Sequence, residues 1–367
     1  MAAAPETEVR NELRAFAREL LAKGQASEGV PRRRLAEAGW FGLEVPEELD
    51  GAGVTFAETA VVLEELGRAA ARTGYFGTTV LAAGTLTALQ PTAERDALLS
   101  RTASGTETVT AALVDATDDS LVAGTFDDTD VPFRIEDSPA GPRLSGHAGF
   151  VPDAAEADRL LLLALDPAGT PVVVLLAPGA QGLTVTGQPV LDATRRFARV
   201  RAEAVAPDAG CVLRFHGEPR RAVARLIDRA AVATACDSLG LAEAMLQATV
   251  AHTRGREQFG RPVGSFQAVK HACADMLVRL SVSRHLVSEA VRLIAEDHVE
   301  AGVTASMAKS YVCAAAVDVV GKAMQLHGGM GYTWESGIHA HLKRATLNRS
   351  LFGSPAAHRR RLARRYR

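Results

Sequence analysis

The stretch over residues 253–276 constrains the fold most, because a short charged turn separates two long helical patterns there. Residues 230–252 contain no proline and repeat apolar side chains at helical spacing. After the turn, Ser265 is expected to cap a second amphipathic helix. The pattern predicts a helical hairpin with a cation-rich elbow, REQFGRPVG, that places Arg256 and Phe259 at a helix end. Such an elbow fits either a docking surface for an anionic, aromatic cofactor or a purely structural turn.

The apolar pattern changes twice along the chain. Residues 1–107 have helical spacing, and residues 207–367 return to it. Between them, residues 108–206 contain short apolar runs separated by turn residues, namely VTAALV, RLLLLAL, TPVVVLLA and GLTVT. We therefore expect an α+β protein with an N-terminal all-α domain, a middle β-barrel or β-sandwich, and a C-terminal helical bundle.

Composition excludes several classes of function. The formal net charge of -2 argues against a nucleic-acid partner bound through bulk electrostatics. The four cysteines form no CxxC pair, so we expect neither a metal site nor a disulfide framework. The first residues, MAAAPETEVRNELRAF, lack the apolar core of a signal peptide. No apolar run approaches the roughly 20 residues of a membrane span, and the scattered cysteines fit a reducing, cytoplasmic compartment.

Three motifs in order carry a family resemblance. RGREQFGRPVGSFQAVKHACADM followed by QLHGGMGYTWE resembles the C-terminal domain of the flavin-dependent acyl-CoA dehydrogenase family. WFGLEVPEELDGAGVTFAETAVVLEELGRA resembles its N-terminal segment. The resemblance implies the family fold with a C-terminal four-helix bundle, FAD as cofactor, an acyl-CoA substrate, an electron-transferring flavoprotein as acceptor, and a homo- or hetero-tetramer.

The resemblance also implies a set of FAD residues, because in family members the elbow reaches across a subunit interface to the neighbour's FAD. Arg256 matches the arginine that meets the pyrophosphate, whose diphosphate geometry suits a guanidinium. Phe259 matches the aromatic residue beside the dinucleotide. The remaining matches are the apolar positions around adenine, the glycine turn that the dinucleotide approaches, and two flavin contacts: Val263, Phe266, Val269, Gln325, Gly328, Gly329, Ser354 and Phe150.

The middle domain departs from the family. The family's TEPxxGSD-like loop and Trp-Ile-Thr motif hold the isoalloxazine ring, but here the matching segments read ALVDATDDS (112–120) and GFVPDAAEAD (149–158). Phe150 stands where the family has tryptophan, and Pro152 has neither a hydroxyl nor an amide hydrogen to offer the flavin. The sequence therefore leaves two alternatives, an intact flavin pocket and a partly degenerate one.

The catalytic base is a second departure. The family reaction needs a carboxylate that takes the α-proton of the thioester while the flavin accepts the β-hydride. The two positions at which family members carry that glutamate are Phe352 and Ala230 here, and neither can accept a proton. Asp237 lies seven residues after Ala230 on the same helix face, so it is either a weak substitute base or a structural acid.

Two further residues carry alternatives. By resemblance, Asp228 contacts the CoA arm of the substrate. Arg195, in LDATRR, binds either a phosphate of CoA or of the cofactor, or forms an inter-domain salt bridge.

Some members of the family form heterotetramers in which one kind of subunit bears the base, and this chain resembles the subunit without it. The leading hypothesis is a subunit of an acyl-CoA dehydrogenase that completes the FAD site of a base-bearing partner. The alternatives are a self-sufficient homotetramer that uses Asp237, and a noncatalytic acyl-CoA-binding or assembly protein.

Overall fold

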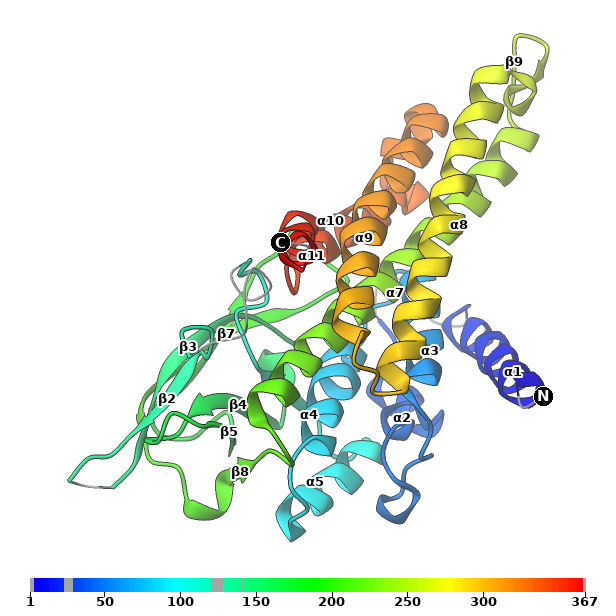
Figure 1. Cartoon of the computed structure of the whole chain (residues 1–367). Helices are drawn as coiled ribbons and strands as arrows, with labels where there is room; N and C mark the ends of the chain where they lie inside the picture. The colour runs from blue at the N-terminus through cyan, green and yellow to red at the C-terminus, as the bar shows by residue number, and fades with distance from the viewer. Residues whose placement is uncertain (1–2, 23–28, 120–127, 140, 366–367) are drawn as a thin grey trace.

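The computed structural model describes residues 3–22, 29–119, 128–139 and 141–365, in which helices, a sheet and further helices follow one another along the chain (Figure 1). A capping box starts the central N-terminal helix: the Thr55 hydroxyl accepts from the Ala57 amide, and Glu58 accepts from the Thr55 amide at 3.0 Å. The N-terminal helices are α1 (Ala3–Ala22), α2 (Arg32–Glu37), α3 (Phe56–Arg68), a π-helix (Phe76–Ala83) that continues into α4 (Gly84–Thr87), and α5 (Ala93–Ala103).

The middle of the chain forms one eight-stranded mixed sheet. Its order is β6-β7-β3-β2-β4-β5-β8, with β1 pairing in parallel to β4. A second buried cluster is built from side chains of these strands, so one face of the sheet curls around a core of its own. The strands are β1 (Val109–Ala112), β2 (Phe133–Glu136), β3 (Arg143–Pro152), β4 (Arg159–Leu165), β5 (Pro171–Leu176), β6 (Leu183–Gln188), β7 (Phe197–Val205) and β8 (Val212–Arg214).

The C-terminal helices form an elongated bundle whose α7–α8 hairpin projects away from the sheet, with β9 at its tip (Figure 1). Phe266, and not Ser265, is the N-cap residue of the second hairpin helix, and it makes no side-chain cap. The Ser265 cap prediction was therefore wrong, because a 3₁₀ turn over Val263–Ser265 precedes the helix. The elements are α7 (Pro219–Gly255), β9 (Glu257–Gln258), β10 (Arg261–Pro262), α8 (Gln267–Ala295), α9 (Ala301–Leu326), α10 (Ile338–Ser350) and α11 (Pro355–Arg364).

Helices α3 and α7 touch backbone to backbone, which joins the first and last parts of the chain in one core. A Cβ atom added at Gly240 would lie 1.8 Å from the carbonyl oxygen of Glu64. A Cβ atom added at Gly67 would lie 2.0 Å from the carbonyl oxygen of Asp237. Only glycine permits this approach. The N-terminal helices therefore sit at a fixed position on α7, the helix that carries the elbow.

Helix α9 is the buried helix of the C-terminal bundle. It lies against α7, α8, α10 and α11, and Ala308, Val312, Cys313 and Ala316 are buried there. Contrary to the expectation that no run would be long enough, α9 has the length and mean hydropathy of a membrane span. Its burial between other helices accounts for that composition.

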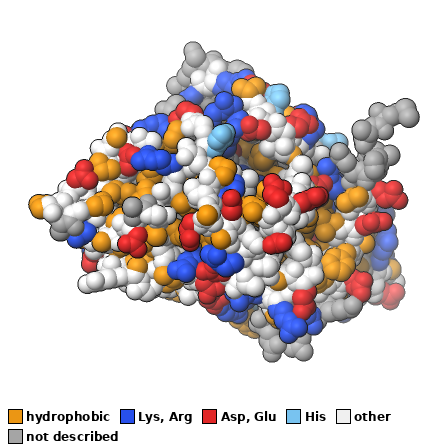
Figure 2. Space-filling view, turned by 90° about the horizontal axis from the view of Figure 1, so that it is seen from below, with side chains coloured by type: hydrophobic (Ala, Val, Ile, Leu, Met, Phe, Trp, Pro, Cys, Tyr) orange, Lys and Arg blue, Asp and Glu red, His pale blue; other side chains and the backbone are white. Residues whose placement is uncertain are grey.

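The surface carries both signs of charge. Figure 2 shows acidic and basic side chains intermingled over the face seen from below, with hydrophobic side chains between them. A mixed surface of this kind gives no single-sign field over that face.

Candidate functional site

The elbow is an ordered turn with two exposed cofactor-type side chains. Arg256 is the C-cap residue of α7; its amide donates to the His252 carbonyl at 2.8 Å, and its carbonyl accepts from the Val263 amide at 2.8 Å. Phe259 has a left-handed backbone with a φ of 53° and a side chain that is 90% exposed. Arg256 is also exposed. The backbone is therefore fixed while the guanidinium and the phenyl ring face outward.

The apolar residues assigned to the adenine region lie beneath this tip. Phe259 meets Phe266 edge to face at a centroid distance of 6.1 Å. The guanidinium of Arg261 lies over the Phe266 ring, 4.1 Å from its centroid. Val263, Phe266 and Val269 are each half-buried, and backbone hydrogen bonds join them in sequence: the Phe266 amide donates to the Val263 carbonyl at 3.2 Å, and the Val269 amide donates to the Phe266 carbonyl at 3.1 Å. This arrangement leaves part of each apolar side chain accessible.

The second predicted cofactor segment follows α9. Gln325, Gly328 and Gly329 are exposed, and the Lys322 ammonium donates to the Gln325 side-chain oxygen at 2.8 Å. A Cβ atom added at Gly328 or Gly329 would meet nothing within 4 Å. These glycines therefore leave open space that a side chain would fill, which fits a backbone approached closely by a dinucleotide.

The two segments adjoin one another. His252, one turn before the end of α7, stacks on His327 at the end of α9 with ring centroids 4.4 Å apart and planes 23° from parallel. Arg256 on one side and Gln325 on the other consequently belong to one end of the bundle. The donor set of a guanidinium, amides and an aromatic ring suits the diphosphate and adenine of FAD.

The two predicted flavin contacts, Ser354 before α11 and Phe150 in the middle domain, are engaged in contacts within the protein. Ser354 is the N-cap residue of α11, and its amide and hydroxyl both donate to the Asp119 carboxylate at 2.7 Å. The Phe150 amide donates to the Gln188 side-chain oxygen at 2.6 Å. The Pro152 carbonyl accepts from the Thr110 hydroxyl at 2.7 Å. Residue 120, the last of the departing loop, lies outside the described residues.

The late base position is filled by a buried aromatic pair. Phe352 is 2% exposed and stacks on Phe76 with centroids 5.7 Å apart and planes 25° from parallel. Its amide donates to the Ala116 carbonyl at 2.6 Å, and its carbonyl accepts from the His358 ring at 2.9 Å. The early base position, Ala230, is fully buried. Both positions therefore contribute apolar packing.

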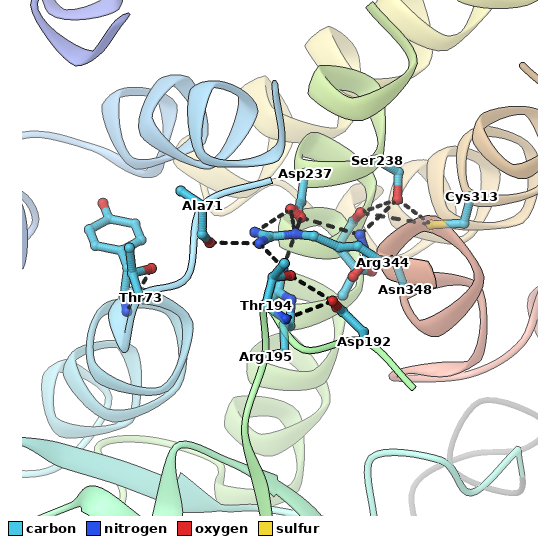
Figure 3. A network of polar contacts seen from close by, with 12 residues as sticks. Ala71, Thr73, Asp192, Thr194, Arg195, Asp237, Ser238, Cys313, Arg344 and Asn348 are labelled. Carbon is cyan, nitrogen blue, oxygen red and sulfur yellow. Dashed lines mark hydrogen bonds and ion pairs between the residues drawn. The ribbon is translucent and has the colours of Figure 1, made fainter. Parts of the chain in front are cut away.

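Asp237 sits in a buried ion network that links three parts of the chain (Figure 3). Arg344 donates to both of its oxygens at 2.8 and 2.9 Å, Arg195 donates at 2.9 Å, and Asn348 donates at 3.3 Å. Burial would raise the pKa of Asp237, but the two arginines overcome it and hold the pKa below its ordinary value. A carboxylate so engaged is a poor proton acceptor, and the geometry fits the structural alternative.

Arg195 forms the inter-domain salt bridge that was one of its two expected roles. It reaches from the loop before β7 to Asp237 on α7. Its guanidinium also lies 4.9 Å from the centroid of Phe76. The network that holds Asp237 therefore continues to the Phe76–Phe352 pair.

Asp228 also has a partner within the chain. It is 6% exposed, and both of its oxygens accept from Arg361 on α11, one at 3.1 Å. Its contact with a CoA arm stays a prediction. The sequence patterns did not single out Phe76 or Arg344, because only the folded chain brings them beside the positions that the motifs name.

Comparison with known proteins identifies the family. Residues 3–106 match the acyl-CoA dehydrogenase N-terminal domain, and residues 220–367 match the acyl-CoA dehydrogenase C-terminal domain. Acyl-CoA dehydrogenase IpdE2 of Mycobacterium tuberculosis is 30% identical over 333 residues, which cover 89% of this chain and 83% of that protein. Probable acyl-CoA dehydrogenase YngJ of Bacillus subtilis is 27% identical over 86% of this chain and 83% of its own length.

Solved structures agree over the whole length. The Tcur3481-Tcur3483 steroid ACAD G363A variant superposes with a TM-score of 0.82 at 28% identity, covering 98% of this chain and 97% of that chain. The ChsE4-ChsE5 complex of Mycobacterium tuberculosis gives a TM-score of 0.84 at 25% identity, covering 98% and 97%. The predicted fold is confirmed. The chain belongs to the acyl-CoA dehydrogenase family, whose members are FAD-dependent oxidoreductases.

Proposed function

We propose that this chain is the subunit of an acyl-CoA dehydrogenase complex that completes the FAD site of a related partner subunit, and that the partner carries the catalytic glutamate. The observation that carries the proposal is the Phe76–Phe352 pair. It places buried aromatic packing at the position where the family's late-loop base would stand. The reaction needs a carboxylate as its base, and this chain has the phenyl ring of Phe352 at that position.

The contacts around that pair support a closed site in this chain. The Phe352 amide is bonded to Ala116, in the same loop that would flank a flavin. Asp119 of that loop accepts both donors of Ser354. Opening room for an acyl chain and an isoalloxazine ring would break these hydrogen bonds and separate two stacked rings. The free-energy cost of leaving such groups unpaired disfavours substrate entry.

The elbow supports the donating role. Arg256 and Phe259 directly flank β9, which lies at the end of the α7–α8 hairpin, away from this chain's sheet (Figure 1). A phenyl ring that is 90% exposed gains from burial against another molecule. The exposure of both side chains would be explained if Phe259 and Arg256 were buried together against a partner's dinucleotide.

In the complex, FAD would supply hydride acceptance at the partner's site. Arg256 would neutralise the diphosphate, Phe259 would pack beside the dinucleotide, and Gln325 with Gly328 and Gly329 would line its path. The partner's carboxylate would remove the α-proton of the thioester. This chain's own residues would bind and orient the cofactor and take no part in proton transfer.

The substrate that we propose is an acyl-CoA with a steroid-derived or fatty acyl group. One similar structure is described as a steroid ACAD, and another is a complex of two named chains. We propose an electron-transferring flavoprotein as the electron acceptor, a heterotetramer as the assembly, and the cytoplasm as the compartment.

The test compares the purified chain alone with the chain co-expressed with a base-bearing partner. Flavin absorbance gives the FAD content, and bleaching on addition of an acyl-CoA gives the reaction. We expect little FAD and no bleaching for the lone chain, and both for the complex. A lone chain that holds stoichiometric FAD and is reduced by an acyl-CoA would show that no partner is needed.

A further inference from the structure

The two separate segments of the proposed cofactor surface are joined by one aromatic contact. His252 lies on α7, four residues before Arg256, and His327 follows Gln325 by two residues at the end of α9. Their rings stack at 4.4 Å with nearly parallel planes. Within the packing of α7 on α9, this stack is therefore the aromatic contact nearest to both Arg256 and Gln325.

Hydrogen bonds fix one of the two rings. The His327 Nδ1 atom lies 2.8 Å from the Ala323 carbonyl oxygen, so it carries the proton and donates to that carbonyl. The amide of His327 also donates to the Ala323 carbonyl. His327 is thus held by its own helix, and His252 rests against its face. The stack therefore joins the His327 ring, which a hydrogen bond holds in place, to the His252 ring, whose position follows that of α7.

Two groups that carry, or can carry, a positive charge act on His252. Burial, His327 and Arg256 together lower the pKa of His252. Arg256 is the C-cap residue of the same helix, α7, and His327 is the C-cap residue of the facing helix, α9. Lys322 on α9 is engaged with Gln325. Protonation of His252 therefore places a cation against groups that repel it.

We propose that the His252–His327 stack is a positioning device for the donated cofactor surface. While the His252 ring is neutral the stack holds the Arg256 segment and the Gln325 segment at the spacing that FAD needs, and protonation of His252 separates them. The inference rests on the proposed function and names the regulation of the same site. His252 and His327 act through Arg256 and Gln325 and are positioning residues.

The experiment measures FAD binding to the apo complex by flavin fluorescence, with substitutions in this chain only. His252→Ala removes the ring, and His252→Phe keeps a stacking ring that cannot be protonated. His285→Ala removes an exposed histidine on α8 and is the matched control. Arg256→Ala reports on the proposed function itself. Assembly of each variant with the partner is checked by size-exclusion chromatography.

We expect His252→Ala to weaken FAD binding by roughly two- to tenfold, the range of an aromatic pair. His252→Phe and His285→Ala should bind like the wild type at pH 8. Because the pKa of His252 is lowered from its ordinary value of 6.5, wild-type affinity should fall only as the pH drops below about 6.5, and the fall should be absent in His252→Phe.

Three outcomes overturn the proposal: unchanged binding by His252→Ala, equal weakening by both His252 variants, or the same pH profile in wild type and His252→Phe. In any of these cases, a loss of FAD in Arg256→Ala leaves the proposed function standing. Unchanged FAD in Arg256→Ala counts against the proposed function instead.

Discussion

Asp237→Asn separates a structural carboxylate from a catalytic one. The substitution keeps the size of the side chain but leaves Arg344 and Arg195 without a counter-charge, and these arginine side chains are only 3% and 9% exposed. Breaking a buried ion pair by removing one partner costs about 3–5 kcal/mol. With an unfolding entropy that scales with the chain's 367 residues, this corresponds to a Tm lower by roughly 4–6 °C.

The assay is thermal and denaturant unfolding at pH 7.5. The pKa of Asp237 is lowered, so its stabilisation is complete above the ordinary carboxylate pKa and is lost only as the pH falls through the folded value. Asp318→Asn is the control, because Asp318 and Arg279 form a 3.1 Å pair with side chains 59% and 48% exposed. We expect that control to cost less than about 1 kcal/mol.

The two accounts of Asp237 give opposite patterns. If Asp237 were the base of a self-sufficient homotetramer, Asp237→Asn would abolish flavin reduction while leaving FAD bound and stability unchanged. An unfolding free energy equal to that of the Asp318→Asn control would therefore refute the ion-network account.

Three further predictions concern packing, pH and the closed base position. Gly240→Ala should cost more than about 2 kcal/mol or prevent folding because of the 1.8 Å contact, whereas Gly321→Ala, with nothing within 4 Å, should be neutral or stabilising by up to about 1 kcal/mol; urea titration measures both. Burial lowers the pKa of His358 to about 3, so the wild type should lose stability as the pH falls from about 6.5 toward 3. The slope of its unfolding free energy against pH should be steeper than that of His358→Asn by up to one proton; unfolding at a series of pH values measures both slopes, and equal slopes would contradict the prediction. Phe352→Glu in the lone chain should destabilise it without creating acyl-CoA-dependent flavin bleaching, because Phe76 still fills the space; bleaching by this single variant would contradict a closed site.

The α, β, α order was predictable because long stretches of helical spacing flank a segment of short apolar runs separated by turn residues. The runs over 159–165 and 170–177 correspond to β4 and β5, which are buried on nearly every residue and therefore read as continuous apolar runs. Strand β7 was not anticipated, since its sequence FARVRAEAV interleaves exposed charges with apolar residues and contains no continuous apolar run. Strand β3 likewise contains glycine and histidine at exposed or half-buried positions.

The cofactor surface was predictable and the closed site was not. Arg256, Phe259, Gln325 and the glycine turn lie in short contiguous motifs, so their type and spacing are visible without a fold. The Phe76–Phe352 contact joins residues 276 positions apart in the sequence, and no local pattern reports it. The ion pair between Arg344 and Asp237 depends in the same way on how α10 packs against α7, and hydrophobic periodicity does not specify that packing.

The most direct test of the central claim is the FAD content of the two-subunit complex when only this chain carries Arg256→Ala. Arg254→Ala, an exposed arginine two residues earlier on the same helix, is the matched control. The account predicts that the complex assembles in both cases, that Arg254→Ala keeps its FAD, and that Arg256→Ala loses most of it. Full FAD content in the Arg256→Ala complex would contradict the claim that this chain's elbow completes its partner's cofactor site.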